Sequence, residues 1–394
     1  MSIILTKKQE EGLKIAIDRF SHGEKYTVIS GYAGTGKSTL VKFIVQSLPG
    51  IDPDIDVVYA TFTGKAAQVL ISKGNSNSMT LHRLLYESKP KPDGTFIRKR
   101  KISIPYKVVI VDEVSMAPKE MIDLLFSHNV YVICLGDPFQ LPPVDKDQDN
   151  HLLDNPHIFL DEIMRQAMDS EIIRLTMDIR AGKDLKLFDG HDVKIYDKNK
   201  LSTGMMMWAD QIISGTNKTR TEMNNNMREL LKRGDNPEDG DKVICLRNYW
   251  DYVSDTGDFL VNGTVGYINN SYSSFNKLPP FFSGGKVIPI LRANFISDTN
   301  ADYGRLQMDK TQILTGERAL DNKTIYGLMR SRKFQHLIPM EFTYGYCITC
   351  HKSQGSEWNK VLVIEERFPF DKEEHARWLY TAATRASDKL VIVR

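Results

Sequence analysis

Short, largely apolar runs recur along the first third of the chain, each followed directly by glycine or polar residues. They lie at positions 26–30, 57–60, 108–111 and 130–135. Runs of this kind indicate strands that are buried on both faces, as in a parallel sheet covered by helices. Because the carboxyl ends of parallel strands share one edge, we expect the polar segments after these runs to lie together. The pattern therefore predicts an α/β fold with its chemistry at that edge.

Helical periodicity surrounds the first of these runs. Four apolar residues before this run and five after it are spaced as on one face of a helix. They are Leu13, Ala16, Ile17 and Phe20 before it, and Leu40, Val41, Ile44, Val45 and Leu48 after it. Strand-like runs return at 361–364 and 389–393, which predicts a second sheet built from later parts of the sequence.

The middle of the chain has a different pattern. Residues 240–248 and 260–268 are typical of strands, with a hairpin turn expected at Asn262–Gly263. Residues 269–277 are polar and are predicted to form a loop, after which Pro279–Pro280 interrupts the chain.

Composition is that of an ordinary globular protein of roughly two to three domains. The chain has 394 residues, of which 41% are hydrophobic and 26% charged, and its net charge is only +2. A nucleic-acid surface would therefore have to come from local basic patches. There is no apolar run as long as a membrane span and no signal peptide, so we expect a cytoplasmic protein without a membrane partner.

The four cysteines do not indicate a disulfide framework in a chain of this length that has no export signal. Residues 347–351 do have the C-x-x-C-H spacing of c-type haem attachment. We reject that interpretation because the segment lies in a strand-like run and no export signal precedes it. No second Cys or His pair in the sequence offers a zinc site.

Residues 31–38, Gly-Tyr-Ala-Gly-Thr-Gly-Lys-Ser, match the phosphate-binding pattern G-x-x-x-x-G-K-[ST] between a predicted strand and a predicted helix. The glycines let consecutive N–H groups turn inward around a polyphosphate at the positive end of that helix. Lys37 can then reach the β- and γ-phosphates, and Ser38 can bind Mg²⁺. We expect a nucleotide to be held by Gly31, Ala33, Gly34, Thr35, Gly36, Lys37, Ser38 and Thr39.

The run at 108–111 ends in Asp112 and Glu113, the acidic pair that a phosphate-loop enzyme needs beside its nucleotide. We expect Asp112 to hold the Mg²⁺ shell and Glu113 to polarise the attacking water. Gln140 follows the run at 130–135 and is expected to sense the γ-phosphate from the same sheet edge. Gln9, at the start of the first helix, can pair with the adenine edge.

Two segments have the composition of nucleic-acid contacts. Residues 61–67 combine hydroxyls, an aromatic ring and Lys65 beside an expected helix N-terminus. Residues 89–101 carry six basic residues, one acid and a Pro-Asp-Gly turn, which predicts a protruding hairpin with Phe96 next to its turn. The hairpin is either a solvated sheet edge or a surface on which Phe96 stacks against a base at a duplex fork. The lone His82 is as consistent with a structural role as with a functional one.

In their order along the chain these motifs resemble those of superfamily 1 helicases of the RecD/Dda branch, whose members translocate 5′ to 3′ on single-stranded DNA. The likeness extends over nearly the whole sequence. Three later segments resemble the family's motifs IV, V and VI, in that order: 160–166, 350–358 and 380–386. A fourth, at 215–220, resembles the opening of the nucleic-acid-facing part of the family's second domain.

The resemblance implies an α/β fold with two RecA-like parallel-sheet motor domains. The first is expected at 1–167, with a small β-hairpin insertion at about 86–105. The second is expected at 168–240 plus 340–394, interrupted at 241–339 by an SH3-like β-barrel insertion with an arm. That arm would brace the basic hairpin.

The resemblance also assigns roles that spacing alone does not. Arg165 and Arg385 would stabilise charge on the γ-phosphate, and if they face the phosphate loop from a second domain, hydrolysis requires domain closure. Together with Lys37, the acidic pair and Gln140 they form the expected catalytic set. Glu357 would reach the ribose. DNA contacts are expected at Thr63, Lys65, His82, Phe96, Thr349, His351 and Ser353.

The function implied is that of an ATP-dependent 5′-to-3′ DNA helicase, a monomer in a bacterial or phage-infected cytoplasm. ATP and Mg²⁺ are the expected cofactors, and single-stranded DNA and a duplex fork the expected ligands. Single-strand-binding or replication proteins are candidate partners. An RNA-directed helicase of the same superfamily and a nucleotide-gated single-strand-binding ATPase that does not unwind are alternatives. A small-molecule kinase fits less well, because it would have no use for the second sheet.

Overall fold

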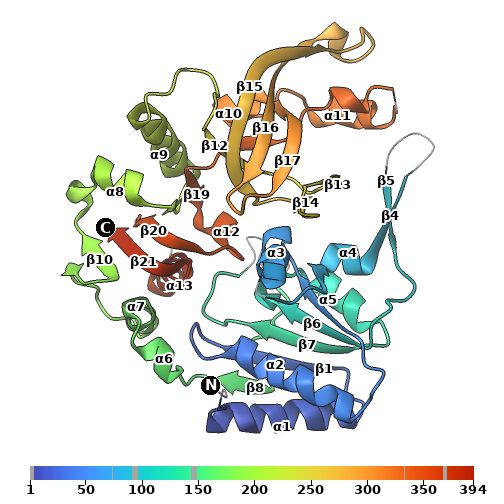
Figure 1. The fold of residues 1–394 in the computed structure, drawn as a ribbon, viewed down its shortest axis with the longest axis vertical. Coiled ribbons are helices and arrows are strands. Elements are labelled where there is room, and N and C mark those ends of the chain that lie inside the picture. The colour runs from blue at the N-terminus through green and yellow to red at the C-terminus, as the bar shows by residue number, and fades with distance from the viewer. Residues whose placement is uncertain (1–3, 73, 91–95, 143–148, 332, 367–370) are drawn as a thin grey trace.

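The structure is a computed structural model that describes residues 4–72, 74–90, 96–142, 149–331, 333–366 and 371–394. Two lobes, each built on a largely parallel sheet, lie against each other, and an antiparallel sheet rises above them (Figure 1). We call these the first lobe, the second lobe and the inserted sheet.

The first lobe contains six strands in the order β3-β2-β6-β7-β1-β8, and all neighbours run parallel, as the apolar runs predicted. The strands are β1 (Tyr26–Gly31), β2 (Val57–Thr61), β3 (Ser78–Thr80), β6 (Val108–Asp112), β7 (Tyr131–Gly136) and β8 (Ile158–Leu160). Around them lie α1 (Lys7–Ser21), α2 (Lys37–Ser47), α3 (Gly64–Ser72), α4 (Leu81–Leu85) and α5 (Lys119–Phe126).

Strand β6 shows why these residues form a central strand. Val108 and Ile110 pack on the face covered by α1 and α2, whereas Val109 and Val111 pack on the face covered by α4 and α5. All four side chains are fully buried. Because both faces are apolar, the polar chemistry is confined to the end of the strand, where Asp112 lies.

The second lobe has the strand order β19-β11-β20-β21-β10-β9, parallel except for the edge strand β9. The strands are β9 (Phe188–Asp189), β10 (Val193–Tyr196), β11 (Gln211–Ser214), β19 (Cys347–Thr349), β20 (Trp358–Ile364) and β21 (Ala386–Val393). Its helices are α7 (Glu171–Arg180), α8 (Thr203–Trp208), α9 (Asn217–Leu230), α12 (Cys350–Ser353) and α13 (Lys372–Ala383), and the short α6 (Arg165–Met168) connects it to the first lobe. Helices α7 and α13 share one apolar cluster, in which Ile172 and Leu175 meet Trp378 and Leu379.

The inserted sheet has the order β17-β16-β15-β12-β18, with every pair antiparallel. Its strands are β12 (Lys242–Cys245), β15 (Val265–Lys277), β16 (Val287–Ser297), β17 (Asp302–Asp309) and β18 (Phe342–Tyr344). A separate pair, β13 (Tyr249–Val253) and β14 (Phe259–Leu260), and the helices α10 (Lys310–Thr315) and α11 (Asn322–Met329) complete this region.

Two predictions for the middle of the chain are wrong. Residues 269–277, predicted as a loop, continue strand β15 and pair with β16. The pattern missed them because few of their side chains are buried, so no apolar alternation marks the strand. Asn262–Gly263 does turn the chain, with Gly263 at a φ of 92°. The predicted hairpin does not form there, because β14 pairs with β13 while β15 pairs with β12 and β16.

A two-stranded hairpin leaves the first lobe between α4 and β6. Strand β4 (Tyr86–Pro90) pairs antiparallel with β5 (Phe96–Arg100), with Tyr86 opposite Arg100. In Figure 1 the hairpin rises on the side of the molecule that carries α11. The side chains of residues 88–98, including that of Phe96, lie outside the described part of the structure.

A buried ion pair fixes the inserted sheet to the second lobe. Nε of Arg228, on α9, lies 3.2 Å from Oδ1 of Asp241, which is fully buried just before β12. The Tyr346 hydroxyl donates a hydrogen bond of 2.9 Å to the same carboxylate. The pair therefore has the additional hydrogen bonds that a buried charge requires.

We expect Asp241→Ala to lower the free energy of unfolding by about 3–5 kcal/mol, because it leaves the Arg228 guanidinium buried without its counter-charge. Urea unfolding followed by circular dichroism measures the loss. The control is Asp123→Ala, which removes an exposed pair with Lys119 and should change stability little. Similar losses in the two variants would contradict the prediction.

Candidate functional site

The phosphate loop connects β1 to α2 and has the backbone that its glycines require. Gly34 and Gly36 have φ values of 77° and 78°, in the left-handed region. A Cβ on Gly31 would come within 2.7 Å of the Leu160 carbonyl oxygen. Residues with side chains would therefore strain or block this turn, and the backbone conformation fits the cradle that a polyphosphate needs.

Lys37 lies across the loop. Its Nζ donates to the carbonyl oxygens of Gly31 (2.7 Å) and Tyr32 (3.1 Å). These are hydrogen bonds that a phosphate would replace, since an ammonium has three donors and binds phosphate as a point charge. Ser38 is exposed in the first turn of α2, and the Thr35 hydroxyl donates to Tyr32 from a buried position.

Gln9 supports the loop from behind. Its Nε2 donates to the carbonyl oxygens of Thr35 (3.4 Å) and Gly36 (3.3 Å), and its Oε1 accepts from the backbone N–H of Thr6 (3.0 Å). The side chain is fully buried. A Cβ on Gly36 would lie 2.4 Å from Nε2, so the amide and the loop are fitted closely together.

The acidic pair lies at the end of β6. The Glu113 backbone N–H donates to the Asp112 carboxylate (2.9 Å), and Glu113 has a φ of 52°, which is uncommon for a residue with a side chain. Burial, and next the Asp112 charge, raise the pKa of Glu113. Arg385 and Lys37 act in the opposite direction on the same pKa. Positive charges from both lobes therefore converge on this carboxylate.

Gln140 offers an acceptor without a partner. It is 8% exposed, and its Oε1 has no hydrogen-bond partner among the residues that the structure describes. A buried amide oxygen left in this way is costly unless a ligand or water satisfies it. Its position after β7, beside Asp137, fits the predicted contact with bound phosphate or its water.

Arg385 is almost fully buried in the turn between α13 and β21. Its guanidinium donates to the carbonyl oxygens of Thr381 (3.1 Å) and Ser356 (3.2 Å) and to the Thr384 hydroxyl (3.1 Å), all in the second lobe. It therefore acts on Glu113 through its charge, and contact with a phosphate would require it to exchange these bonds.

The side chain of Arg165 lies outside the described residues, but its backbone can be placed. The Met164 N–H donates to the Gly34 carbonyl oxygen (3.0 Å), and a Cβ on Gly34 would lie 3.2 Å from that of Ala167. The segment around Arg165 therefore packs directly on the phosphate loop.

Contacts between the lobes reveal a residue whose role the motif analysis did not single out. The Tyr380 hydroxyl, on α13, accepts from the Ala33 N–H of the phosphate loop (2.9 Å) and donates to Oδ2 of Asp137 (2.6 Å). Both Tyr380 and Asp137 are buried, and burial raises the pKa of the tyrosine, which keeps its proton. No spacing rule marks Tyr380, because its role depends on a partner in the other lobe.

Further bonds continue this interface. The Thr381 hydroxyl accepts from the Leu141 N–H (2.9 Å), and Nε2 of Gln354 donates to the Leu141 carbonyl oxygen (2.9 Å). At the other side of the loop, the Arg180 guanidinium lies 3.4 Å from the centroid of the Tyr32 ring. The second lobe therefore contacts both the phosphate loop and the loop that carries Gln140.

Two of the predicted DNA contacts are not available in this conformation. Ser353 is fully buried and its hydroxyl donates to the Cys350 carbonyl oxygen (2.7 Å). Lys65 is 5% exposed, because its Nζ pairs with Asp298 of the inserted sheet at 2.8 Å. The inserted sheet covers α3 at this point, so sequence position alone could not tell that the ammonium is already neutralised.

Four further predicted contacts lie at partly exposed positions, while the side chain of Phe96 is outside the described residues. Thr63 immediately precedes α3, with its hydroxyl accepting from the Ala66 N–H (3.2 Å), and the His82 ring lies near Phe62 (5.8 Å between centroids). Thr349 and His351 flank the start of α12, and burial lowers the pKa of His351, which favours its neutral form. Glu357 is exposed between α12 and β20.

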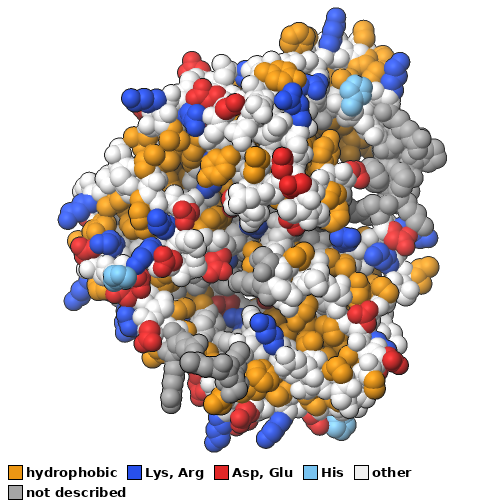
Figure 2. Space-filling model, in the orientation of Figure 1, with side chains coloured by type: hydrophobic (Ala, Val, Ile, Leu, Met, Phe, Trp, Pro, Cys, Tyr) orange, Lys and Arg blue, Asp and Glu red, His pale blue; other side chains and the backbone are white. Residues whose placement is uncertain are grey.

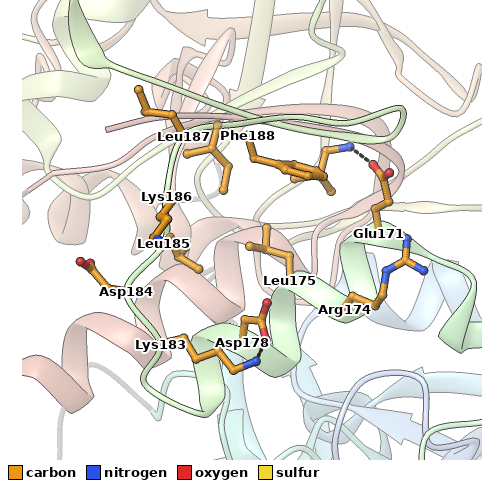
Figure 3. Close-up of a pocket in the computed structure, with 12 residues that line it drawn as sticks. Glu171, Arg174, Leu175, Asp178, Lys183, Asp184, Leu185, Lys186, Leu187 and Phe188 are labelled. Atoms are coloured by element: carbon orange, nitrogen blue, oxygen red, sulfur yellow. Dashed lines mark hydrogen bonds and ion pairs between the residues drawn. The ribbon is translucent and has the colours of Figure 1, made fainter.

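A cavity with a volume of about 400 Å³ lies away from this site, between α7 and the segment that leads to β9 and β10. Figure 3 shows Leu175, Leu185, Leu187 and Phe188 around its apolar interior, with charged side chains such as Glu171 at the rim. None of the predicted site residues is among those that line it.

The described residues contain no cluster of three or more His, Cys, Asp or Glu side chains arranged to hold a metal. Ser38 and Asp112 nevertheless fit Mg²⁺, which is commonly held by one or two protein oxygens together with phosphate and water. Among the described helices, none is both long and apolar enough to cross a membrane.

Two protein-family models match the chain. An AAA domain model matches residues 5–200, and a UvrD-like helicase C-terminal domain model matches residues 344–393. The two matches contain the phosphate loop, α13 and Arg385.

Curated relatives and a solved structure agree with these matches. The ATP-dependent RecD2 DNA helicase of Deinococcus radiodurans is 26% identical over 97% of this chain, and the phage T4 ATP-dependent DNA helicase dda is 25% identical over 58% of it. The chain aligns with only 49% and 57% of their lengths. A crystal structure of Pif1 helicase from Bacteroides, in complex with ADP-AlF3 and ssDNA, matches the fold with a TM-score of 0.52 at 18% identity, over 99% of this chain and 92% of that one.

We expect Tyr380→Phe to lower kcat for ATP hydrolysis about tenfold or more, because the variant removes two buried hydrogen bonds from α13 to the first lobe, one to the phosphate loop and one to Asp137. Steady-state kinetics with single-stranded DNA present measure kcat and KM separately. Tyr131→Phe is the matched control, since that buried hydroxyl bonds only within the first lobe, to Thr27 and Ala16. If both variants hydrolyse ATP at the wild-type rate, the contact does not matter for turnover.

The raised pKa of Glu113 has a pH signature. A general base must be deprotonated, so kcat/KM for hydrolysis should fall as pH drops through the raised pKa. The acidic limb of the profile should therefore lie above the ordinary glutamate value of 4.5. Circular dichroism at each pH checks that the protein stays folded, and a rate that is constant down to pH 4.5 would remove Glu113 from the role of base.

Proposed function

Because the chain belongs to the RecD/Dda/Pif1-like helicases of superfamily 1, we propose that it is an ATP-dependent DNA helicase that moves 5′ to 3′ along single-stranded DNA and unwinds duplex. The observation that carries this proposal is the division of the nucleotide site between the lobes. Lys37, Asp112 and Glu113 come from the first lobe, and Arg385 and Tyr380 come from the second.

The chemistry of this site is that of phosphoryl transfer to water. The phosphate loop and Lys37 hold the polyphosphate, while Ser38 and Asp112 hold Mg²⁺, which neutralises charge on the phosphates. Glu113 accepts the proton of the attacking water, and Gln140 orients that water or senses the γ-phosphate. Arg165 and Arg385 place positive charge opposite the equatorial oxygens, where it develops in the transition state.

Movement along DNA follows from the division of the nucleotide site between the two lobes. Lys37 and Arg385 are both bonded to carbonyl groups of their own lobes, and an anionic ligand between the lobes gives each of them a better partner. Nucleotide binding therefore favours closure of the lobes, and loss of phosphate favours opening. A strand held by Thr63 and His82 on one lobe and by Thr349 and His351 on the other would be advanced by this alternation.

The choice of DNA draws on the relatives, whereas the direction draws on the resemblance of the motifs to the RecD/Dda branch. RecD2 and dda are named as ATP-dependent DNA helicases, and the Bacteroides Pif1 structure contains single-stranded DNA and ADP-AlF3. They support DNA rather than RNA as the substrate of this chain.

We also propose that the domains follow the predicted division. The first motor domain takes residues 1–167 with the hairpin as its insertion, and the second takes 168–240 plus 340–394. The antiparallel inserted sheet supports an SH3-like barrel with an arm at 241–339, although β18 of that sheet lies a few residues beyond this range. The protein is proposed to act as a monomer.

Two duplexes test the proposal, one with a 5′ single-stranded tail and one with a 3′ tail, each incubated with the protein, ATP and Mg²⁺. We expect strand separation of the 5′-tailed duplex only, and no separation by Lys37→Ala, which loses its contact with the phosphates. An RNA tail of the same sequence serves as the comparison. Unwinding of the 3′-tailed duplex would refute the polarity, and hydrolysis without unwinding of any duplex would refute the helicase activity.

A further inference from the structure

Positive charge is concentrated in two projections of the molecule. One is the basic hairpin at 89–101. The other, which we call the distal arm, consists of the described residues 271–290, 316–331 and 333–338, and it includes the outer parts of β15 and β16 together with α11. By sequence, the spans 89–101, 271–290 and 316–338 contain thirteen Lys and Arg against three Asp and Glu, a net charge of +10. Since the whole chain has a net charge of +2, the rest of it carries −8.

The distal arm also presents aromatic rings to solvent. Phe281, Phe275 and Tyr326 are 71%, 68% and 61% exposed, more than any other aromatic side chain that the structure describes. Phe281 lies against Phe334, with 5.6 Å between the ring centroids. Figure 2 shows hydrophobic and basic side chains interspersed over the end of the molecule where β15, β16 and α11 lie in Figure 1.

These rings are not needed for the arm's own core. Beneath them lies a separate small cluster of apolar side chains, in which Ile325 and Leu328 of α11 are buried with Leu278 and Ile288. Tyr326, between the two buried positions of the helix, points away from that cluster and is exposed. Exposed rings grouped in this way on a folded element indicate a binding surface.

Cations lie beside two of the rings of the distal arm. The Arg330 guanidinium lies 5.7 Å from the centroid of Tyr326, and Nζ of Lys333 lies 5.6 Å from the centroid of Phe334. An unpaired strand offers base faces for stacking and phosphates for the cations, whereas a duplex hides its base faces. The combination therefore favours single-stranded nucleic acid over duplex.

The arm is separate from the predicted path of the translocated strand. Thr63, just before α3, and His351, on α12, belong to the two lobes, whereas α11 lies at the outer end of the molecule, on the side of the basic hairpin (Figure 1). We propose that the distal arm binds the displaced single strand, which is the strand on which the motor does not move. This inference rests on the proposed function.

The test uses two duplexes with the same 5′ tail, one of which also has an unpaired 3′ tail on the other strand. Without ATP, wild type should bind the two-tailed fork more tightly. Phe281→Ala/Tyr326→Ala should bind that fork about tenfold more weakly, since each stacked base contributes substantially. Its affinity for the 5′-tailed duplex and its ATP hydrolysis on single-stranded DNA should match wild type.

Phe188→Ala is the matched control, because Phe188 is also an exposed ring (48%) but lies on β9 of the second lobe. The proposal fails if the second tail adds no affinity in wild type, if a duplex arm substitutes for it equally, or if the double variant loses affinity on both DNAs. If the wild-type protein gains affinity from the second tail but does not unwind either duplex, the proposed function is refuted while binding of single-stranded DNA by the arm is supported.

Discussion

One buried hydroxyl connects the two halves of the nucleotide site. Tyr380 reaches from α13 to the phosphate-loop N–H of Ala33 and to the Asp137 carboxylate, and it bonds to both directly, at 2.9 and 2.6 Å. Buried polar groups need hydrogen-bond partners, so the closed position of the lobes must keep the Tyr380 hydroxyl, the Ala33 N–H and the Asp137 carboxylate together. That restriction fixes where α13, and with it Arg385, stands relative to Glu113.

The same interface explains why the site can work in steps rather than continuously. Lys37 and Arg385 are each satisfied by carbonyl groups of their own lobe, so neither charge is left without partners before a ligand arrives. A ligand that offers both of them phosphate oxygens gains from drawing the lobes together. The strained backbone at Glu113 and the orphaned oxygen of Gln140 lie where that ligand is expected, as is common at functional sites.

The sequence was informative where one short segment contains a whole physical requirement. The phosphate loop needs glycines and a lysine at fixed spacing, and β6 needs a buried apolar run before Asp112, so both were predicted. It was uninformative where a residue's state depends on a distant segment. Lys65 is neutralised by Asp298, 233 positions away, and Tyr380 acquires its role from the other lobe. The outer part of β15 was missed because backbone pairing with β16 maintains it, without an apolar face.

The separation of charge between the projections and the body gives the molecule a large electric dipole. In the field of a polyanion such a dipole experiences a torque, so the protein would turn its hairpin and arm toward DNA before any contact forms, while repulsion keeps the acidic body away. Added salt screens this torque within about 10 Å at 0.1 M. Ionic strength would then govern how often an encounter begins at the right end of the molecule.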